Sequence, residues 1–214
     1  DTSITKEEFY SYKFDTKYSE HSVIMKSINL VLKQPPPEDG ILKEALEVLK
    51  NWDGDTGPES KGTALVVLSL RPSDANKSSI DPSILLDRIY DSAVLLKRIY
   101  GRLDVPWKMV NRLVRGSIDL GLGGAPDILR AIYGRWNDNN RIVGIAGDCY
   151  IMMVEWDRDG HVSSQSIHQF GSATSKMDSP HFSDQAKLFA EQKFKPVWFE
   201  KSEILKNLES KYSP

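Results

Sequence analysis

The sequence predicts an α+β fold in which several helices come first, a β-hairpin follows and a last helix lies near the C-terminus. Apolar residues recur at helical spacing in separate stretches between residues 20 and 100. From Arg141 to Trp156 the chain is instead apolar and β-prone, and Asp157-Arg158-Asp159-Gly160 then has the composition of a turn. The spacing separates the two kinds of element, because a helix repeats every 3.6 residues and a strand every two.

Two helices are expected before residue 53. From Glu20 to Gln34 apolar residues follow helical spacing, and the stretch ends at Pro35-Pro36-Pro37, which cannot continue a helix. After Gly40 a second apolar face continues until the turn Asp53-Gly54-Asp55. The apolar positions are Val23, Ile24, Ile28, Val31 and Leu32 in the first stretch, and Ile41, Leu42, Ala45, Leu46, Val48, Leu49 and Trp52 in the second.

Two further helices are expected before Gly101. The stretch from Gly62 to Leu70 is too apolar for a surface helix and suits a buried helix or a strand, of which we favour the helix. Asp81 followed by Pro82 is typical of a helix cap with proline at the first helical position, and apolar spacing continues to Tyr100. This last stretch is the best-defined helix in the sequence.

The remaining chain contains the predicted hairpin. Glycines between Val105 and Pro126 favour an irregular, tightly turned segment, closed by a short helix from Pro126. His161 to Phe170 alternates in the manner of a strand, and a last helix is expected from Ser183 or Asp184 to about Phe194. We divide the single segment 1–214 into a mainly helical part, 1–140, a β-hairpin, 141–171, and a C-terminal helix with its tail, 172–214.

A hairpin accompanied only by helices leaves strand edges without partners. An isolated two-stranded hairpin is marginally stable in water unless something covers or extends it. The predicted sheet is therefore incomplete, and we expect this chain to be a part of a larger domain.

The composition is that of an ordinary globular domain. The chain has 214 residues, of which 40% are hydrophobic and 27% charged, with a formal net charge of −2. This balance favours neither nucleic acid nor an anionic membrane surface as a partner. No apolar run approaches the roughly 18 to 20 residues that span a bilayer, and the first residues do not resemble a signal peptide. If the parent protein is exported, we expect its signal outside this chain.

Candidate catalytic residues are few. Ser179-Pro180-His181 and Asp184 contain the residue types of a hydrolytic triad, but no strand-nucleophile-helix elbow surrounds Ser179, so a turn with a helix cap by Ser183 or Asp184 is the favoured interpretation. The single cysteine, Cys149, cannot form an internal disulfide, and its strand-like flanks predict a buried thiol.

Metal and phosphate sites have no clear pattern either. The four histidines, His21, His161, His168 and His181, show no zinc spacing, and we expect no carboxylate beside them at i, i+4 in a ligand arrangement. The segment 121–127 lacks the lysine of a phosphate-binding loop and is predicted to be a sharp turn. We therefore predict no catalytic, cofactor-binding or metal-binding residue in this chain.

Four segments, in chain order, carry a resemblance to a known family. They are residues 46–54, which end in a Trp-Asp-Gly turn, with 62–65; residues 105–116 with 119–127; residues 144–160; and residues 171–185 with 193–198. Together they resemble the C-terminal part of the β-subunit of the penicillin acylase family. The version Ser179-Pro-His-Phe-x-Asp-Gln185 is more similar to the acyl-homoserine-lactone and aculeacin acylases of that family than to its penicillin G acylases.

The resemblance implies an N-terminal-nucleophile hydrolase with stacked αββα layers, cut from a precursor so that a serine begins the β-subunit. In such enzymes the serine's α-amino group acts as base, and the substrate is an N-acyl amide. Here the chain begins with Asp1, which has no hydroxyl. The resemblance therefore transfers no catalytic residue and no calcium ligand to this chain. It implies as partner the remainder of the precursor (the α-subunit and the N-terminal part of the β-subunit), and a periplasmic or secreted location.

Two other functions stay open from the sequence. The chain could be a non-catalytic helical interaction module, which would fold cooperatively by itself. It could also be a self-contained serine hydrolase that uses Ser179 and His181, which a fluorophosphonate probe would label.

Overall fold

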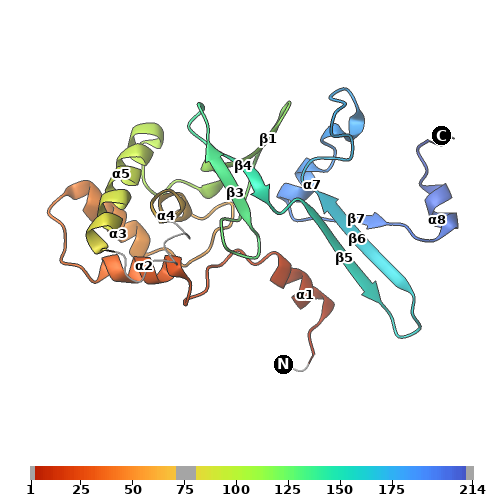
Figure 1. The fold of residues 1–214 in the computed structure, drawn as a ribbon, viewed down its shortest axis with the longest axis horizontal. Helices are drawn as coiled ribbons and strands as arrows, with labels where there is room; N and C mark the ends of the chain where they lie inside the picture. Colours follow the sequence, from red (N-terminus) through yellow and green to blue (C-terminus); the bar gives the residue numbers. More distant parts are fainter. Residues whose placement is uncertain (1–2, 71–80, 211–214) are drawn as a thin grey trace. The chain divides into compact units, whose positions relative to one another are not determined.

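The computed structural model describes residues 3–70 and 81–210 (Figure 1). Helices and strands are both well represented, which confirms the predicted α+β class. Contacts divide the chain into two compact units, Asp1–Gly147 and Asp148–Pro214. No described helix is long and apolar enough to cross a membrane. Asp1 lies outside the described residues.

The first unit begins with helices that confirm four of the expected ones. These are α2 (Val23–Leu32), α3 (Gly40–Lys50), α4 (Thr63–Ser69) and α5 (Pro82–Tyr100), preceded by α1 (Lys6–Lys13), which we did not predict. The short amphipathic stretch of α1 is hard to recognise from spacing, and none of its residues is buried. Its capping box shows where it starts: the Thr5 hydroxyl accepts from the Glu8 amide while the Glu8 carboxylate accepts from the Thr5 amide.

Helix α5 is the centre of the helical layer and contacts α2, α3 and α4. The Asp81 side chain accepts from the Ser83 amide, Pro82 occupies the first turn, and Gly101 ends the helix at φ 72°. Left-handed geometry of this kind suits glycine because a Cβ is strained there. The buried stripe of α5 is Leu85, Ile89, Ser92, Ala93 and Leu96.

A four-stranded sheet follows the helices, and it corrects the prediction of an irregular segment between Val105 and Pro126. The elements are α6 (Trp107–Val110), β1 (Asn111–Arg115), β2 (Ile118–Gly121), β3 (Ile132–Trp136) and β4 (Ile142–Gly147). The strand order is β2-β1-β4-β3, with β1 and β4 parallel and the other neighbours antiparallel. Residues 126–131 form no helix, so the short helix from Pro126 was wrong.

The glycines suggested an irregular segment, but in the structure they allow neighbouring elements to pack closely. Gly116, at φ 58°, lies in the turn between β1 and β2. A Cβ on Gly121 would lie 2.6 Å from the Lys108 Cβ atom, and one on Gly134 would lie 2.2 Å from the Ile142 Cγ2 atom. Glycine at these places lets elements approach each other, so it accompanies regular structure here.

The second unit holds a three-stranded sheet, where a two-stranded hairpin over 141–171 was expected. Its strands are β5 (Tyr150–Trp156), β6 (Val162–His168) and β7 (Lys195–Val197), in the order β5-β6-β7. Residues 142–147 belong to the first sheet, because Gly147 at φ 109° and the two residues after it separate β4 from β5. The turn Asp157–Gly160 is confirmed, since the Asp157 amide donates to His161 O and the Gly160 amide to Asp157 O.

The helices of the second unit are shorter than predicted. The last predicted helix is reduced to α7 (Ala186–Ala190), preceded by the 3₁₀ helix η2 (Pro180–Phe182), and the tail contains β7 and α8 (Lys201–Lys206). Helix α7 contacts β6 and buries Phe189 against that side of the sheet. The predicted capping by Ser183 or Asp184 is not found: α7 follows Gln185, which provides no side-chain cap, and Ser179 caps η2.

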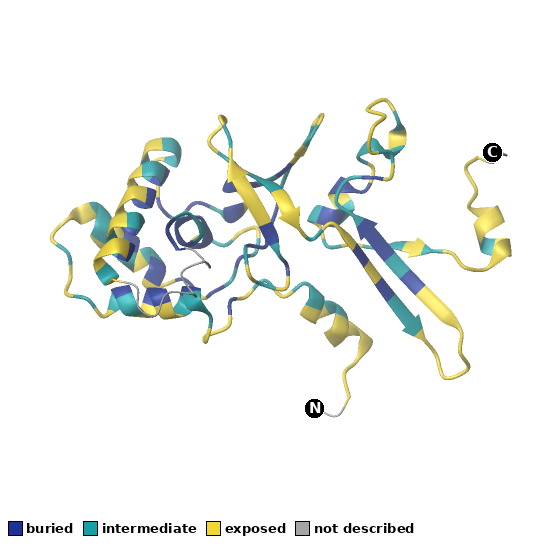
Figure 2. Cartoon of the chain, viewed as in Figure 1, coloured by how far each residue is buried: buried dark blue, intermediate teal, exposed yellow. Residues whose placement is uncertain are grey.

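Buried and exposed residues alternate along β5 (Figure 2). Side chains alternate along β5, so Ile151 and Met153 are buried, whereas Tyr150, Met152 and Trp156 are exposed on the other face. Among the described residues β5 pairs only with β6, which leaves its other edge open. An exposed, apolar edge strand of this kind can pair with another chain or aggregate.

The helical core allows a matched test on one helix. Ile89 is completely buried in α5, whereas Ile84 of the same helix is 48% exposed. Ile89→Ala should reduce the free energy of unfolding by about 2–5 kcal/mol because it leaves a cavity. Ile84→Ala should change it by less than about 0.5 kcal/mol. Urea unfolding followed by circular dichroism measures both, and equal effects of the two substitutions would contradict the assigned face of α5.

Candidate functional site

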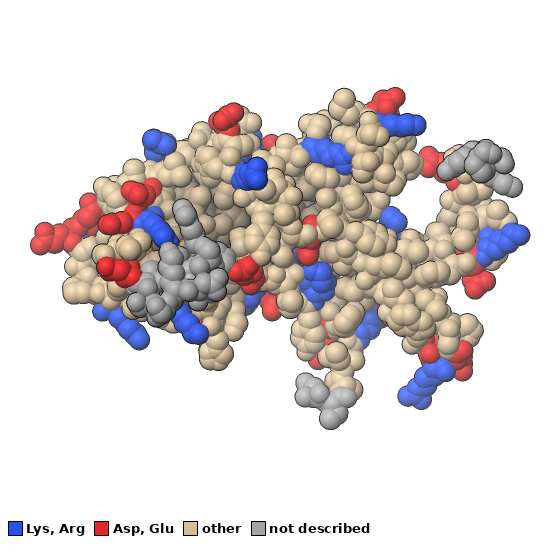
Figure 3. Space-filling model, in the orientation of Figure 1, with Lys and Arg blue, Asp and Glu red and all other residues tan. Residues whose placement is uncertain are grey.

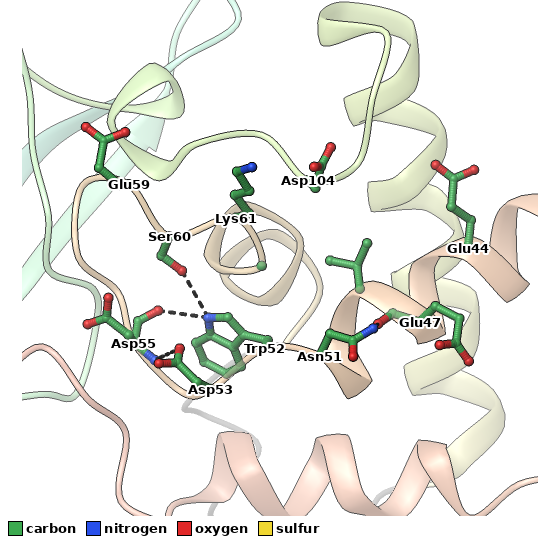
Figure 4. Close-up of a pocket in the computed structure, with 12 residues that line it drawn as sticks. Glu44, Glu47, Asn51, Trp52, Asp53, Asp55, Glu59, Ser60, Lys61 and Asp104 are labelled. Carbon is green, nitrogen blue, oxygen red and sulfur yellow. Dashed lines mark hydrogen bonds between the residues drawn. The ribbon is translucent and has the colours of Figure 1, made fainter.

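A hollow in the first unit lies beside the turn that follows α3 (Figure 4). Its volume is about 670 Å³. The end of α3, the segment leading to α4 and the loop after α5 contribute its walls. The lining residues are Glu44, Glu47, Val48, Asn51, Trp52, Asp53, Asp55, Glu59, Ser60, Lys61, Gly62 and Asp104.

Trp52 forms the apolar wall of this hollow and is fixed by two hydrogen bonds. Its Nε1 donates to Asp55 O at 2.8 Å and to Ser60 Oγ at 3.2 Å. Gly62 packs on the indole so closely that a Cβ there would lie 2.5 Å from the Trp52 Cδ1 atom. The Thr63 hydroxyl also donates to Asp55 O, at 2.8 Å. The Trp-Asp-Gly turn predicted from the sequence is therefore a rigid corner between α3 and α4.

The carboxylates of the hollow are compensated by partners. Asp55 Oδ1 accepts from the Thr16 hydroxyl at 2.6 Å. The other five carboxylates form ion pairs, namely Glu44 with Lys97, Glu47 with Lys50, Asp53 with Lys17, Glu59 with Lys108, and Asp104 with Arg102. On the face shown in Figure 3, acidic and basic side chains are likewise interspersed. The hollow therefore presents no strong field to attract a cation.

The pKa values near the hollow reflect these local bonds. The backbone amide of Asp55 donates to the Asp53 carboxylate and lowers its pKa, with Lys17 adding to the effect. The pKa of Asp104 is lowered mainly by its hydrogen bond with Arg102. Both carboxyl groups are therefore held ionised, which does not suit them to proton transfer near neutral pH.

The hollow lacks a catalytic arrangement. Ser60 is the hydroxyl-bearing side chain among its lining residues, and its oxygen accepts from Trp52 Nε1. Because the single Thr63 hydroxyl proton goes to Asp55 O, the Ser60 hydroxyl donates to the Thr63 oxygen. No histidine is among the lining residues, so Ser60 has no base to activate it. We interpret the hollow as part of the scaffold.

Ser179, His181 and Asp184 lie together but do not form a triad. The Ser179 hydroxyl accepts from the His181 amide at 3.2 Å and caps η2, as expected for a turn. Both ring nitrogens of His181 face carboxylates: Nδ1 is 2.9 Å from Asp184 Oδ2 and Nε2 is 2.6 Å from Glu209 Oε2. A triad needs one imidazole nitrogen on the serine oxygen, and neither nitrogen meets this condition.

The expectation that no carboxylate accompanies a histidine at i, i+4 was wrong. Asp157 Oδ2 lies 2.9 Å from His161 Nδ1, and Asp159 completes a group whose ligand atoms lie within 4.8 Å of one another. The predicted turn covers Asp157–Gly160 and ends one residue before His161. Asp157 also accepts from the Asp159 and His161 amides, and the latter bond is the main cause of its lowered pKa. All three side chains are exposed, and their bonds are those of a β-turn, so we assign no metal here.

The glycine-rich segment 121–127 is a sharp turn, as predicted. Gly124 has φ 89°, and its amide donates to Thr56 O at 2.8 Å. The Ala125 amide donates to Arg130 O. These amides are therefore engaged within the fold, which argues against a phosphate-binding loop here.

Comparison with known proteins identifies the family. The family model described as penicillin amidase matches residues 1–206. The chain therefore belongs to the penicillin amidase family, in agreement with the four segments of resemblance. A search of curated proteins found no match.

A solved structure of related type is a thermostable penicillin G acylase from Alcaligenes faecalis in orthorhombic form. It is 13% identical in sequence, with a TM-score of 0.48. The match covers 99% of this chain and 49% of that chain, so this chain spans about half the length of the acylase it matches.

Cys149 corrects one prediction and gives a direct test. It was expected to be buried within a strand, but it is exposed in the link between β4 and β5. A thiol-specific reagent such as 5,5′-dithiobis(2-nitrobenzoate) should therefore react fully with the folded chain, without denaturant. Cys149→Ser should abolish the signal. Reaction that requires urea would show instead that the thiol is covered.

Proposed function

We propose that this chain is part of an N-acyl amide hydrolase whose catalytic serine lies in a portion of the protein outside residues 1–214. The match to the penicillin amidase family over residues 1–206 carries this proposal. The described residues support its second half, because Ser60 and Ser179 each lack a histidine positioned to take the hydroxyl proton. The chain then contributes structure, as the C-terminal segment of the nucleophile-bearing subunit.

The proposed chemistry is acyl transfer to a serine. An N-terminal serine of the nucleophile-bearing subunit attacks the amide carbonyl, and its α-amino group accepts the hydroxyl proton. Collapse of the tetrahedral intermediate releases the amine, and water then cleaves the acyl-enzyme to a carboxylic acid. Hydrogen-bond donors outside this chain stabilise the oxyanion. The segment Ser179–Gln185 favours acyl-homoserine-lactone or aculeacin-type acylases as the subgroup, and therefore a substrate with an acyl chain on an amide nitrogen.

The open edge of β5 favours the remainder of the precursor as partner. Tyr150, Met152 and Trp156 are 55%, 39% and 68% exposed on one face of the sheet. Apolar side chains that are exposed together in this way, rather than singly, are typical of an interaction surface. The Ser164 hydroxyl, on the same face, is buried without a hydrogen-bond partner. A strand from the upstream part of the subunit would pair with the open edge of β5, and a further layer of an αββα arrangement, packed on this face, would cover the exposed side chains. The family also implies processing from a precursor and a periplasmic or secreted location.

The catalytic part of the proposal predicts the activity of the isolated chain. It should neither hydrolyse N-acyl-homoserine lactones and chromogenic acyl amides nor react with a fluorophosphonate probe, because losing even one oxyanion donor costs about 10²–10³ in kcat and here the nucleophile is absent too. Mass spectrometry after probe treatment and chromatographic assays measure both outcomes.

The matched variant is Ser179→Ala in the complete processed protein. It should retain amide hydrolysis, whereas alanine at the first residue of the nucleophile-bearing subunit should abolish it. Probe labelling of the isolated chain that disappears in Ser179→Ala would overturn the proposal and favour a self-contained serine hydrolase.

A further inference from the structure

We propose that the protonated ring of His181 binds the C-terminal segment 201–210 to the turn around η2, and that loss of the proton releases this segment. We call this link the clip. The two contacts of its imidazole come from different parts of the second unit. Asp184 follows three residues later in the same turn, and Glu209 lies 28 residues away at the end of the chain that the structure describes. The ring therefore joins two segments that are distant in sequence.

The chemistry of the ring makes this link dependent on its charge. Both nitrogens face carboxylate oxygens, at 2.9 Å and 2.6 Å. An ionised carboxylate only accepts hydrogen bonds, and only the imidazolium has two N–H donors. The neutral ring can donate to one carboxylate alone, and its other nitrogen then points a lone pair at the second. Because Asp184 is held close by the turn, the Glu209 contact is the one that opens.

Within residues 3–70 and 81–210, two charged groups act on the ring, and both are already its partners. Asp184 and Glu209 are the charged groups that act on the His181 ring. The loop packed against it contributes the Ala173 amide, which donates to His181 O, and Gly171, where a Cβ would lie 2.1 Å from that oxygen. In the preceding turn the Ser179 amide donates a hydrogen bond to the Lys176 carbonyl. These contacts hold the backbone of His181 in place, and its ring can gain or lose a proton without moving the turn.

The segment that the clip holds has few other attachments. Helix α8 (Lys201–Lys206) has no buried residue. The described hydrogen bonds of residues 201–210, apart from that of Glu209, involve only neighbours such as Glu200, Glu203 and Asn207. A hollow of about 440 Å³ lies between this segment and β7, with Trp198 and Leu208 in its walls. Release of Glu209 would free the segment and open this apolar hollow.

The direction of the pH effect follows from the shifted pKa of His181. Its hydrogen bonds with Asp184 first, and with Glu209 next, raise the pKa of the ring above the ordinary value of about 6.5. A group with a raised folded-state pKa contributes its stabilisation fully below the unfolded pKa and loses it as pH rises through the folded pKa. The clip is therefore closed in acid and opens on the alkaline side of the ordinary histidine range.

Nuclear magnetic resonance of the 214-residue chain across pH 5 to 9 tests the clip. The backbone ¹H–¹⁵N nuclear Overhauser effect of residues 204–209 should fall at high pH, with the same midpoint as the titration of the His181 ring. Glu209→Ala should leave these residues mobile at every pH. Glu209→Gln should keep them ordered at every pH, because its amide accepts from the imidazolium and donates to the neutral ring.

Glu203→Gln is the matched control, since this carboxylate lies in the same segment without contacting His181. It should retain the wild-type pH dependence. A segment whose mobility does not follow the His181 titration, or is unchanged by Glu209→Ala, would overturn the proposal. These readouts require no hydrolysis, so they are independent of the proposed acylase function.

Discussion

Thr56 is the point at which three distant parts of the first unit are tied together. Its amide and its hydroxyl both donate to Thr16 O, at 2.9 and 2.8 Å, and its own carbonyl accepts from the Gly124 amide. The residue is fully buried, so each of these groups would cost about 1–3 kcal/mol if left without a partner. The hydrogen bond from Trp52 Nε1 to Asp55 O holds the chain just before Thr56. Gly124, whose amide binds Thr56, also accepts at its carbonyl from Trp107 Nε1. These bonds hold together the segments that follow α1, α3 and β2.

Local signals in the sequence were sufficient for helices α2 to α5 and for the turn Asp157–Gly160. Asp81, Pro82 and Gly101 specify the ends of α5 through caps that depend only on adjacent residues. The four strands of the first sheet could not be predicted in the same way, because β1 pairs with β4 from about thirty residues away and the glycines between them act through tertiary contacts. Spacing along the chain contains no information on such pairing. Strand β7 is only three residues long, Lys195–Val197, and is defined by its partner β6.

The same limit applies to side-chain clusters. The sequence favoured a turn at Ser179 because no strand-nucleophile-helix elbow surrounds it, and in the structure its hydroxyl accepts from the His181 amide. It could not reveal that Glu209 reaches His181, since that contact depends on the path of the tail past β7. It did contain the spacing of Asp157 and His161, and a search for carboxylates four residues before each histidine would have found it. The proposed amide hydrolysis rests on the family match, because no cluster among the described residues is arranged for it.

We propose that residues 1–214 complete a larger acylase, and complementation tests this proposal most directly. The preceding part of the precursor and this chain, produced as separate polypeptides in one cell, should co-purify and hydrolyse an N-acyl amide. Met152→Lys, which places a charge on the exposed face of β5, should weaken their association at least about tenfold, or about 1.4 kcal/mol. Ser163→Lys, on the opposite face of the same hairpin, is the control and should associate normally. A chain that stays monomeric, unfolds cooperatively alone and never binds the preceding part would contradict the account.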